Sequence, residues 1–433
     1  MLTTHIHLVK SLAAFCFLLS AFFFLSCQPD SKETKTPKAV FIIVDGISAD
    51  VIEKLNPPAL EEISKVGGYT RAYVGGEKGT YTETPTISAV GYNSLLTATW
   101  VNKHNVWDND IADPNYHYWD IFRITEEHNP ELKTAIFSTW TDNRTKLVGE
   151  GLPQTGNVTL DYKFDGLELD TIKYPHDDNS DYIHQIDEAV AAEAARYIGE
   201  KGPDLSWIYL QYTDDMGHHF GNSERFYEAI RMADKQVGKI WDAIQKREKE
   251  FDEDWLIVIT TDHGRDSTEG KHHGGQSDRE KLTWIVTNAD SLNERFKQTP
   301  GVVDIMPSIC NHMGISIPDE VKKEIDGVPF IGEADLADLK AEKKDGKITL
   351  RWKSLNNAEG AQVQILVTGS NHFKTGQEDT YRKVGEAEIR QESFSFDVND
   401  GLFHKVLVKG PNHYVNTWVG EEVAGPLKRS TGH

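Results

Sequence analysis

Short runs of apolar residues alternate, over the first three quarters of the chain, with longer segments whose apolar positions recur every three or four residues. The runs are too short for buried helices and are typical of strands covered on both faces of a sheet. The spaced pattern is typical of helices with one buried face. The predicted strands are Ala39–Ile47, Thr134–Trp140, Leu205–Tyr212, Trp255–Thr261 and Leu282–Thr287, and the clearest predicted helices are Asp181–Glu200 and Ser223–Glu248. This alternation predicts an α/β fold with a mostly parallel sheet sandwiched between helices.

The pattern changes near Gly332. From Leu336 onward, short segments that alternate apolar and polar residues are separated by turn residues, as in KITLRWKS and AQVQILVTGS. Such segments are typical of antiparallel strands in a β-sandwich. We therefore expect an α/β domain over residues 39–332 and a C-terminal all-β sandwich over residues 336–433, which resembles a fibronectin type III module. Trp352, on the second of these strands, is its expected core anchor.

The beginning of the chain has the pattern of a targeting signal. An almost continuous apolar run from Ser11 to Leu25 is shorter than a membrane-spanning helix needs, and polar residues follow it at once. This predicts a signal peptide over residues 1–26; a plain secretory signal and an uncleaved anchor are the alternatives. Leu25-Ser26-Cys27 resembles the cleavage site of bacterial lipoproteins, with Cys27 as the lipid-bearing first residue and residues 27–38 as a tether. The protein is then exported and lipid-anchored to a bacterial membrane, facing the periplasm or the cell surface.

Acidic residues dominate the charge of the chain. Its 433 residues include 68 Asp and Glu against 46 Lys and Arg, which gives a formal net charge of −22. Without a dense basic run, this charge argues against nucleic-acid polymers as partners. Small anionic substrates are compatible with it where divalent metal ions offset the carboxylates locally, and the 17 His residues favour such sites. After lipidation Cys310 is the one free thiol, which we expect to be a buried apolar residue.

Two candidate chemical groups lie in the first hundred residues. Asp45 directly follows the first predicted strand, and open α/β sheets place their ligands at such strand ends. Its alternative role is in a turn or a helix cap. Ser88 lies at the polar entry to a predicted helix, after Pro85 and Thr86. It can be a nucleophile or a helix N-cap.

Further along the chain, carboxylates and imidazoles lie together after two more strands. Asp214 and His218 follow the third predicted strand, and the alternative for them is an ordinary hydrophilic loop. Asp262 and His263 are adjacent where the fourth strand ends, and His272-His273 follows in the next loop. Neighbouring strand residues face opposite ways, but the chain can turn at Gly264 and let both reach one ion. Converging carboxylates and imidazoles suit Zn²⁺.

These clusters, in this order, resemble the alkaline phosphatase superfamily over about residues 38–332. Within it they are similar to the nucleotide pyrophosphatase/phosphodiesterase branch. The matching text is FIIVDG, then PTISAVGYNSLLTATWVNKHNVWDND, TDDMGHHFG, TTDHG and HHGG. The resemblance implies an alkaline-phosphatase-like catalytic domain that binds two zinc ions and cleaves a small-molecule phosphate ester through a phospho-serine intermediate. It implies that Ser88 is the nucleophile. One zinc ion would be held by Asp214, His218 and His273, and the other by Asp45, Asp262, His263 and the Ser88 oxygen.

Some positions depart from that branch. Ser88 stands where the branch usually has Thr and is more like the monoesterase nucleophile, and Gly91 replaces a phosphate-binding Asn. The short spacing of the last ligand is more like that of the glycosylphosphatidylinositol ethanolamine phosphate transferases. We expect a phosphodiesterase or nucleotide pyrophosphatase. A phosphomonoesterase, with Arg231 or Arg265 as a phosphate clamp, and a phosphoethanolamine-type transferase are the alternatives.

Other classes of function stay open from the sequence. A non-enzymatic surface binding protein would use the metals structurally, and a metal-independent glycan-processing enzyme would need two opposed carboxylates without clustered His. A sulfatase is disfavoured because its modification signal is missing at the nucleophile. Trp107, Tyr116 and Tyr118 are candidates for stacking on a base, with core packing as the alternative. The oligomeric state is not determined by the sequence.

Overall fold

The computed structural model describes residues 35–355, 359–398 and 401–420. The expected signal peptide and the expected lipid-bearing Cys27 lie outside these residues. Within them, no helix is both long enough and apolar enough to cross a membrane.

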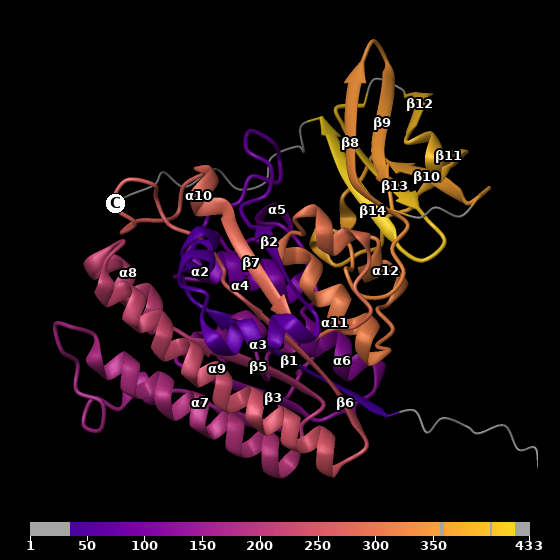
Figure 1. Ribbon diagram of the computed structural model, residues 1–433. Helices are drawn as coiled ribbons and strands as arrows, with labels where there is room; N and C mark the ends of the chain where they lie inside the picture. Colours follow the sequence, from indigo (N-terminus) through magenta and orange to yellow (C-terminus); the bar gives the residue numbers. More distant parts are fainter. Residues whose placement is uncertain (1–34, 356–358, 399–400, 421–433) are drawn as a thin grey trace, which may run out of the picture. The chain divides into compact units, whose positions relative to one another are not determined.

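A seven-stranded sheet forms the centre of the α/β region, with the strand order β2-β7-β6-β1-β5-β3-β4 (Figure 1). β1 pairs in parallel with β5, β5 with β3, and β3 with β4, whereas β7 is antiparallel to both of its neighbours. The strands are β1 (Thr36–Val44), β2 (Gly68–Tyr73), β3 (Thr134–Ser138), β4 (Tyr162–Phe164), β5 (Leu205–Leu210), β6 (Glu253–Thr260) and β7 (Leu282–Thr287). The predicted mostly parallel α/β fold is confirmed, and the predicted strand Leu282–Thr287 is its antiparallel member.

Both faces of the sheet are buried, which explains the continuous apolar runs. Along β1, Phe41 and Ile43 belong to one apolar core, and Val40 and Ile42 belong to the core on the opposite face. Side chains of a strand alternate between faces, so two covered faces require an apolar residue at every position. α7 and α9 pack side by side over the second core (Figure 1), and Cys310 is buried in the first.

The helices of the α/β region have the following bounds. They are α2 (Ala49–Leu55), α3 (Pro58–Val66), α4 (Ser88–Thr97), α5 (Val101–His104), α6 (Ile121–His128), α7 (Asp181–Lys201), α8 (Tyr212–Phe220), α9 (Glu224–Glu250), α10 (Asp278–Lys281), α11 (Ile305–Met313) and α12 (Asp319–Lys322). Single π or 3₁₀ turns lie at Asn143–Val148, Pro153–Thr155, Leu167–Leu169, Glu294–Gln298 and Val302–Asp304 in this region, and at His372–Thr375 and Ile389–Gln391 further on.

The C-terminal part consists of antiparallel sheets, as predicted. One sheet has the order β11-β10-β13-β14 and the other the order β12-β9-β8. Their strands are β8 (Leu336–Lys344), β9 (Lys347–Ser354), β10 (Gln362–Thr368), β11 (Arg382–Glu388), β12 (Ser393–Asp397), β13 (Phe403–Lys409) and β14 (Tyr414–Gly420). The two sheets share one apolar core, in which Trp352 of β9 is buried.

Buried lysines join the C-terminal sheets to the α/β region. The ammonium of Lys405, on β13, lies 2.7 Å from a carboxylate oxygen of Glu324 and 2.7 Å from one of Asp379. Lys103, on α5, donates to Oδ1 of Asn416 on β14 over 2.8 Å. Neither lysine side chain is exposed at all. Such charges are tolerated only because each has close partners, so the sheets and the α/β region depend on each other.

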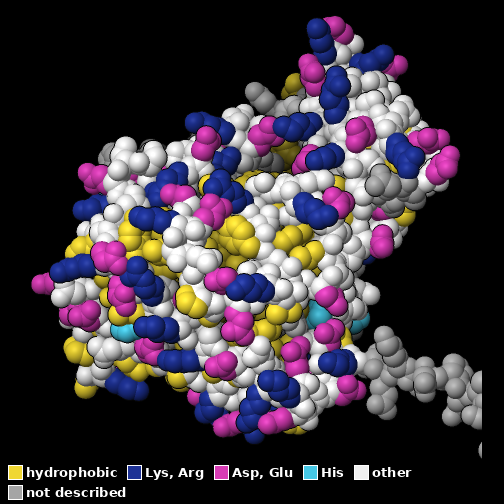
Figure 2. All heavy atoms as spheres, in the orientation of Figure 1, with side chains coloured by type: hydrophobic (Ala, Val, Ile, Leu, Met, Phe, Trp, Pro, Cys, Tyr) yellow, Lys and Arg dark blue, Asp and Glu magenta, His cyan; other side chains and the backbone are white. Residues whose placement is uncertain are grey.

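Acidic and basic side chains are interspersed on the face of the molecule seen in Figure 2, around a central area of hydrophobic side chains. On that face the basic side chains do not gather into one patch.

Candidate metal centre and active site

The structure brings the seven predicted site residues into one cluster at an edge of the central sheet. They arrive on separate elements. Asp45 follows β1, and Asp262 and His263 follow β6. The other four are Ser88 at the start of α4, Asp214 and His218 on α8, and His273 in the loop before α10. The segment Tyr212–Phe220 was expected as the end of a strand or a loop. It is a helix, and its i, i+4 spacing puts Asp214 and His218 on one face.

Ser88 is the hydroxyl that faces the cluster. It is the first residue of α4, it is 7% exposed, and its Oγ lies 3.3 Å from Nε2 of His263. Thr86, two residues earlier, is engaged with the backbone instead: its Oγ1 donates to the carbonyl of Gly275 and accepts from the amide of Gly274, both at 2.9 Å. α4 follows a long loop, so Ser88, unlike Asp45 and Asp262, does not lie close after the end of a strand.

Asp45, Asp262 and His263 form the first group that can hold an ion. Nε2 of His263 lies 3.4 Å from Oδ1 of Asp45 and 3.3 Å from Oδ2 of Asp262. Both carboxylates are almost fully buried. The other oxygen of Asp45, Oδ2, accepts hydrogen bonds from the hydroxyls of Tyr92 and Tyr209. The side chain of Asp45 does not cap a helix, which was the alternative expected for it.

Asp214, His218 and His273 form the second group. Nε2 of His218 lies 3.2 Å from Oδ2 of Asp214 and 3.0 Å from Nε2 of His273. His263 lies between the two groups, since its ring stacks on that of His273 with centroids 3.7 Å apart. Asp214, His263 and His273 offer ligand atoms that all lie within 4.8 Å of one another, and His218 is not part of that set. His272 is exposed; its backbone amide donates to a carboxylate oxygen of Asp266, and its carbonyl accepts from the Asp266 amide.

The hydrogen bonds of the imidazoles fix which nitrogen carries the proton. Nδ1 of His263 donates to the carbonyl of Gly264 over 2.9 Å, and Nδ1 of His273 donates to the carbonyl of Thr86 over 2.8 Å. Each neutral ring therefore turns the lone pair of Nε2 toward the cluster. A backbone partner on one nitrogen that leaves the other free is the usual arrangement of metal-binding histidines.

The first group lacks a donor for its inward-facing carboxylate oxygens. Oδ1 of Asp45 and Oδ2 of Asp262 are buried and have no hydrogen-bond partner within the described residues. Three acceptors, these two oxygens and Nε2 of His263, thus converge. A buried unpaired carboxylate is costly, and a divalent cation would satisfy all three acceptors at once. The donor set of imidazole and carboxylate suits zinc.

The pKa values of the cluster reflect this crowding of negative charge. Burial, together with Asp262 and Asp214, raises the pKa of Asp45 well above its ordinary value. Burial also raises the pKa of Asp262 to about 7 and lowers the pKa of His263. Burial alone would raise the pKa of Asp214, but the guanidinium of Arg265 and the hydrogen bond of His218 bring it below its usual range.

Neither predicted phosphate clamp is available to a ligand. Arg265 is buried, and its guanidinium donates to the carbonyls of Gly46 and Lys271 and to Asp214. Arg265 therefore positions Asp214, a candidate metal ligand, rather than a substrate. Arg231 lies on the surface of α9, where it pairs with Glu224 and Glu228.

Gly91 has a packing reason to differ from the Asn of the resembled branch. A Cβ at this position would lie 2.7 Å from the carbonyl oxygen of Asp262. Only glycine lets α4 approach the end of β6 so closely.

A cavity of about 160 Å³ opens beside the cluster. It is lined by Asp45, Ser88, Tyr92, Asn109, Trp140, Tyr209, Gln211 and Asp214. Tyr92, Tyr209, Trp140 and Gln211 were not predicted from the sequence. Oδ1 of Asn109 accepts the amide of Ala89 over 3.0 Å, which leaves its Nδ2 as a possible donor to a ligand near the start of α4.

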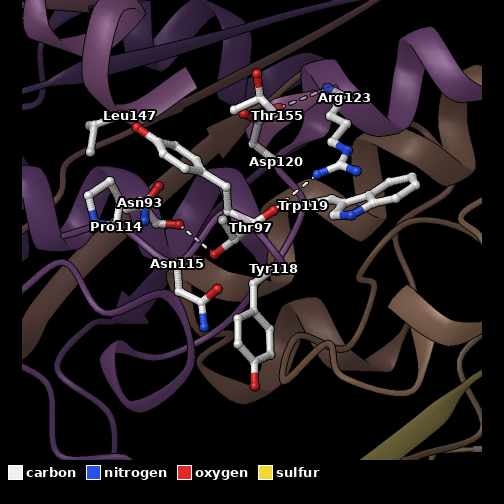
Figure 3. Close-up of a pocket in the computed structure, with 11 residues that line it drawn as sticks. Asn93, Thr97, Pro114, Asn115, Tyr118, Trp119, Asp120, Arg123, Leu147 and Thr155 are labelled. Carbon is white, nitrogen blue, oxygen red and sulfur yellow. Dashed lines mark hydrogen bonds between the residues drawn. The ribbon is translucent and has the colours of Figure 1, made fainter. Parts of the chain in front are cut away.

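The predicted base-stacking aromatics lie elsewhere. Tyr116 and Tyr118 border a second cavity of about 10 Å³, which has room for one water molecule (Figure 3). Tyr118 is 3% exposed and packs against Phe373, as the core alternative predicted, whereas Trp107 is 47% exposed.

Comparisons with known proteins agree with the resemblance. The family model described as type I phosphodiesterase / nucleotide pyrophosphatase matches residues 39–390. A 2,3-bisphosphoglycerate-independent phosphoglycerate mutase of Clostridium tetani is 30% identical over 120 residues, which are 26% of this chain and 22% of the mutase. The human ectonucleotide pyrophosphatase/phosphodiesterase family member 1 is 22% identical over 247 residues, which are 53% of this chain and 24% of that protein. The matches thus span less than a third of the length of these curated relatives.

Two solved structures are also similar. Human ectonucleotide pyrophosphatase/phosphodiesterase 5 matches with a TM-score of 0.47 and 14% identity, over 65% of this chain and 96% of that chain. The phosphonate monoester hydrolase of Agrobacterium radiobacter matches with a TM-score of 0.49 and 13% identity, over 89% of both chains.

Proposed function

The chain belongs to the type I phosphodiesterase / nucleotide pyrophosphatase family, and from this we propose that it is an enzyme that hydrolyses phosphate esters with two bound zinc ions. The observation that carries the proposal is the convergence of Oδ1 of Asp45 and Oδ2 of Asp262 on Nε2 of His263, at 3.4 and 3.3 Å, with no hydrogen-bond donor to either carboxylate oxygen among the described residues. A divalent cation at this point would satisfy these acceptors at once and offset the charge of the buried carboxylates.

The chain offers two sets of ligands. Asp45, Asp262, His263 and Oγ of Ser88 would hold one zinc ion. Asp214, His218 and His273 would hold the other, and three protein ligands leave a position for substrate or water. The ions would supply the positive charge that favours an ionised serine and offsets the charge on the phosphoryl oxygens.

Ser88 is the nucleophile in this proposal. Its Oγ attacks phosphorus, the bond to the leaving oxygen breaks, and a phospho-serine forms that water then hydrolyses. The start of α4 assists, since the amides of a helix N-terminus favour negative charge there. Nδ2 of Asn109, at the same place, would donate to a phosphoryl oxygen.

A phosphodiester is the proposed substrate rather than a phosphomonoester. No Lys or Arg is among the residues that line the cavity, so a second charge on the phosphoryl group would have no counter-charge beyond the ions. Ser88 supports the phosphomonoesterase alternative, because a serine at this position is more like the monoesterase nucleophile. In addition, a relative is named for phosphoglycerate, which is a monoester.

The experiment compares purified wild-type protein with Ser88→Ala on bis-p-nitrophenyl phosphate and on p-nitrophenyl phosphate. We expect faster turnover of the diester, and a loss of at least about 10³-fold in Ser88→Ala with zinc still bound. Ser64→Ala, a serine on α3 that bonds only its own helical turn, is the matched control. If Ser88→Ala keeps its activity, Ser88 is not the nucleophile. If kcat/KM is much larger for the monoester than for the diester, the protein is not a phosphodiesterase.

We also propose that the signal peptide over residues 1–26 is removed and that Cys27 carries lipid on the exported protein. The support is the apolar run that ends at Cys27, followed by polar residues. Cys27→Ser is then expected to abolish labelling by a radioactive fatty acid, and unchanged labelling rejects the assignment.

A further inference from the structure

Gln211 forms part of the cavity wall beside the candidate metal ligands. It precedes α8, between β5 and the helix that carries Asp214. Its backbone is fixed, because its amide donates to Oδ1 of Asp187 over 3.1 Å and the next amide donates to Oδ2 of the same carboxylate over 2.9 Å. The side chain therefore starts from a fixed point on the cavity wall.

The orientation of the Gln211 side-chain amide is fixed as well. Its Nε2 donates to Oδ2 of Asp215 over 3.0 Å, and Oδ1 of Asp215 accepts the hydroxyl of Ser180 over 2.9 Å. A carboxylate offers acceptors only, so it selects the nitrogen of the amide. Asp215 does not line the cavity. The amide atom left to face the cavity is Oε1, which is an acceptor.

Trp140 supplies a flat apolar surface in the same wall. It follows β3, and its ring meets the edge of Tyr92, with centroids 6.5 Å apart and an interplanar angle of 69°. The ring is half-buried and borders the cavity. Ring-shaped groups with an apolar face pack well on such a surface.

The charge of the wall restricts what can bind there. Among the eight lining residues there are two Asp and no Lys or Arg. Zinc ions would offset the aspartates at the phosphoryl group, but nothing in this wall offsets a second anionic group further out. An uncharged organic group is therefore favoured over a chain of further phosphates.

We propose that Gln211 is a specificity-determining residue for the organic group of the ester: Oε1 accepts a hydrogen bond from a hydroxyl or amine on an uncharged ring-bearing group that packs against Trp140. This inference rests on the proposed function, because the ring is placed by the ester bond at Ser88. It extends that function by naming the chemistry of the group that is recognised.

The test measures kcat/KM of the zinc-loaded protein on three p-nitrophenyl phosphodiesters. Thymidine 5′-(p-nitrophenyl phosphate) and the p-nitrophenyl phosphodiester at O6 of glucose carry hydroxyl donors, and bis-p-nitrophenyl phosphate carries a ring without a donor. We expect Gln211→Met to lower kcat/KM by about 3- to 10-fold on the donor-bearing substrates, which is the size of one neutral hydrogen bond, and by less than about 2-fold on bis-p-nitrophenyl phosphate. Trp140→Leu is expected to lower it on all three.

Ser180→Ala is the matched control, since it removes the far hydrogen bond of Asp215 but leaves the Gln211 amide in place. If Gln211→Met lowers kcat/KM more on the thymidine ester, the recognised group is a nucleoside. If it lowers kcat/KM more on the glucose ester, the recognised group is a sugar. An equal loss on all three substrates in Gln211→Met, or none on any, overturns the inference while wild-type turnover upholds the proposed function. If wild-type protein hydrolyses none of the diesters, the proposed function fails and the inference fails with it.

Discussion

The hydroxyl of Tyr209 donates a hydrogen bond to Oδ2 of Asp45 over 2.7 Å. The hydroxyl of Tyr92 also donates to this oxygen and lies 2.8 Å from the hydroxyl of Tyr209. With Oδ2 engaged in this way, Oδ1 is the oxygen that Asp45 turns toward His263. Two buried tyrosines thus orient a candidate metal ligand from behind.

Tyr209→Phe should therefore weaken zinc binding without unfolding the protein. Loss of a partner that orients a ligand typically costs about 10- to 100-fold in metal affinity. A competition titration against a zinc chelator measures this change. Tyr69→Phe, which removes an exposed bond to Glu53, is the control. Equal affinities in the two variants would show that Asp45 needs no such support.

The two adjacent histidines of the last loop should behave differently. His273→Ala is expected to lose one of the two zinc ions, because Nε2 of His273 lies within 3.0 Å of its counterpart in His218. His272→Ala is expected to keep both, because His272 bonds Asp266 through its backbone, whereas His218 and His273 contact each other through Nε2. Native mass spectrometry counts the ions. The reverse result would assign the ligand to His272.

Lys405→Met should destabilise the whole protein. The substitution leaves Glu324 and Asp379 buried without their ammonium partner, a loss that typically costs about 3–5 kcal/mol. Lys340→Met, which breaks an exposed pair with Glu77, should cost less than about 1 kcal/mol. Urea unfolding of both variants provides the comparison. Similar free energies of unfolding would mean that the C-terminal sheets are not coupled to the α/β region through Lys405.

Asp120 should make stability depend on pH. Burial raises its pKa to about 7, above the unfolded value near 4. Between these two values the folded protein binds the extra proton. The contribution of Asp120 to the free energy of unfolding therefore falls as pH rises from about 4 to about 7, by at most about 4 kcal/mol.

Asp120→Asn removes this titration and can still cap α6. The difference in unfolding free energy between the variant and the wild type should thus move in favour of the variant from pH 5 to pH 8. Urea unfolding of the metal-free chain at both pH values measures it. A difference that does not change with pH would mean that Asp120 titrates at its ordinary value.

The apolar runs predicted the central strands because both faces of the sheet are covered. They could not predict the direction of Leu282–Thr287, since a fully buried strand has the same composition whether it is parallel or antiparallel. The edge strand β2, GYTRAY, was missed because only Ala72 in it is fully buried.

The candidate ligands were predictable because carboxylates and imidazoles stand out against apolar strands. Tyr92 and Tyr209 were not, since each lies in a run that a core residue would fit equally well. The role of Arg265 depends on Gly46 and Asp214, which are far from it in sequence. No local pattern contains that information.

Zinc titration into the metal-free protein tests the two-metal site most directly. Hydrolysis of bis-p-nitrophenyl phosphate is followed while native mass spectrometry counts the bound ions. The cluster of Asp45, Asp262 and His263 beside Asp214, His218 and His273 predicts two zinc ions per chain, with activity that appears only as the second ion binds. Full activity in the metal-free protein, or saturation at a single ion, would contradict it.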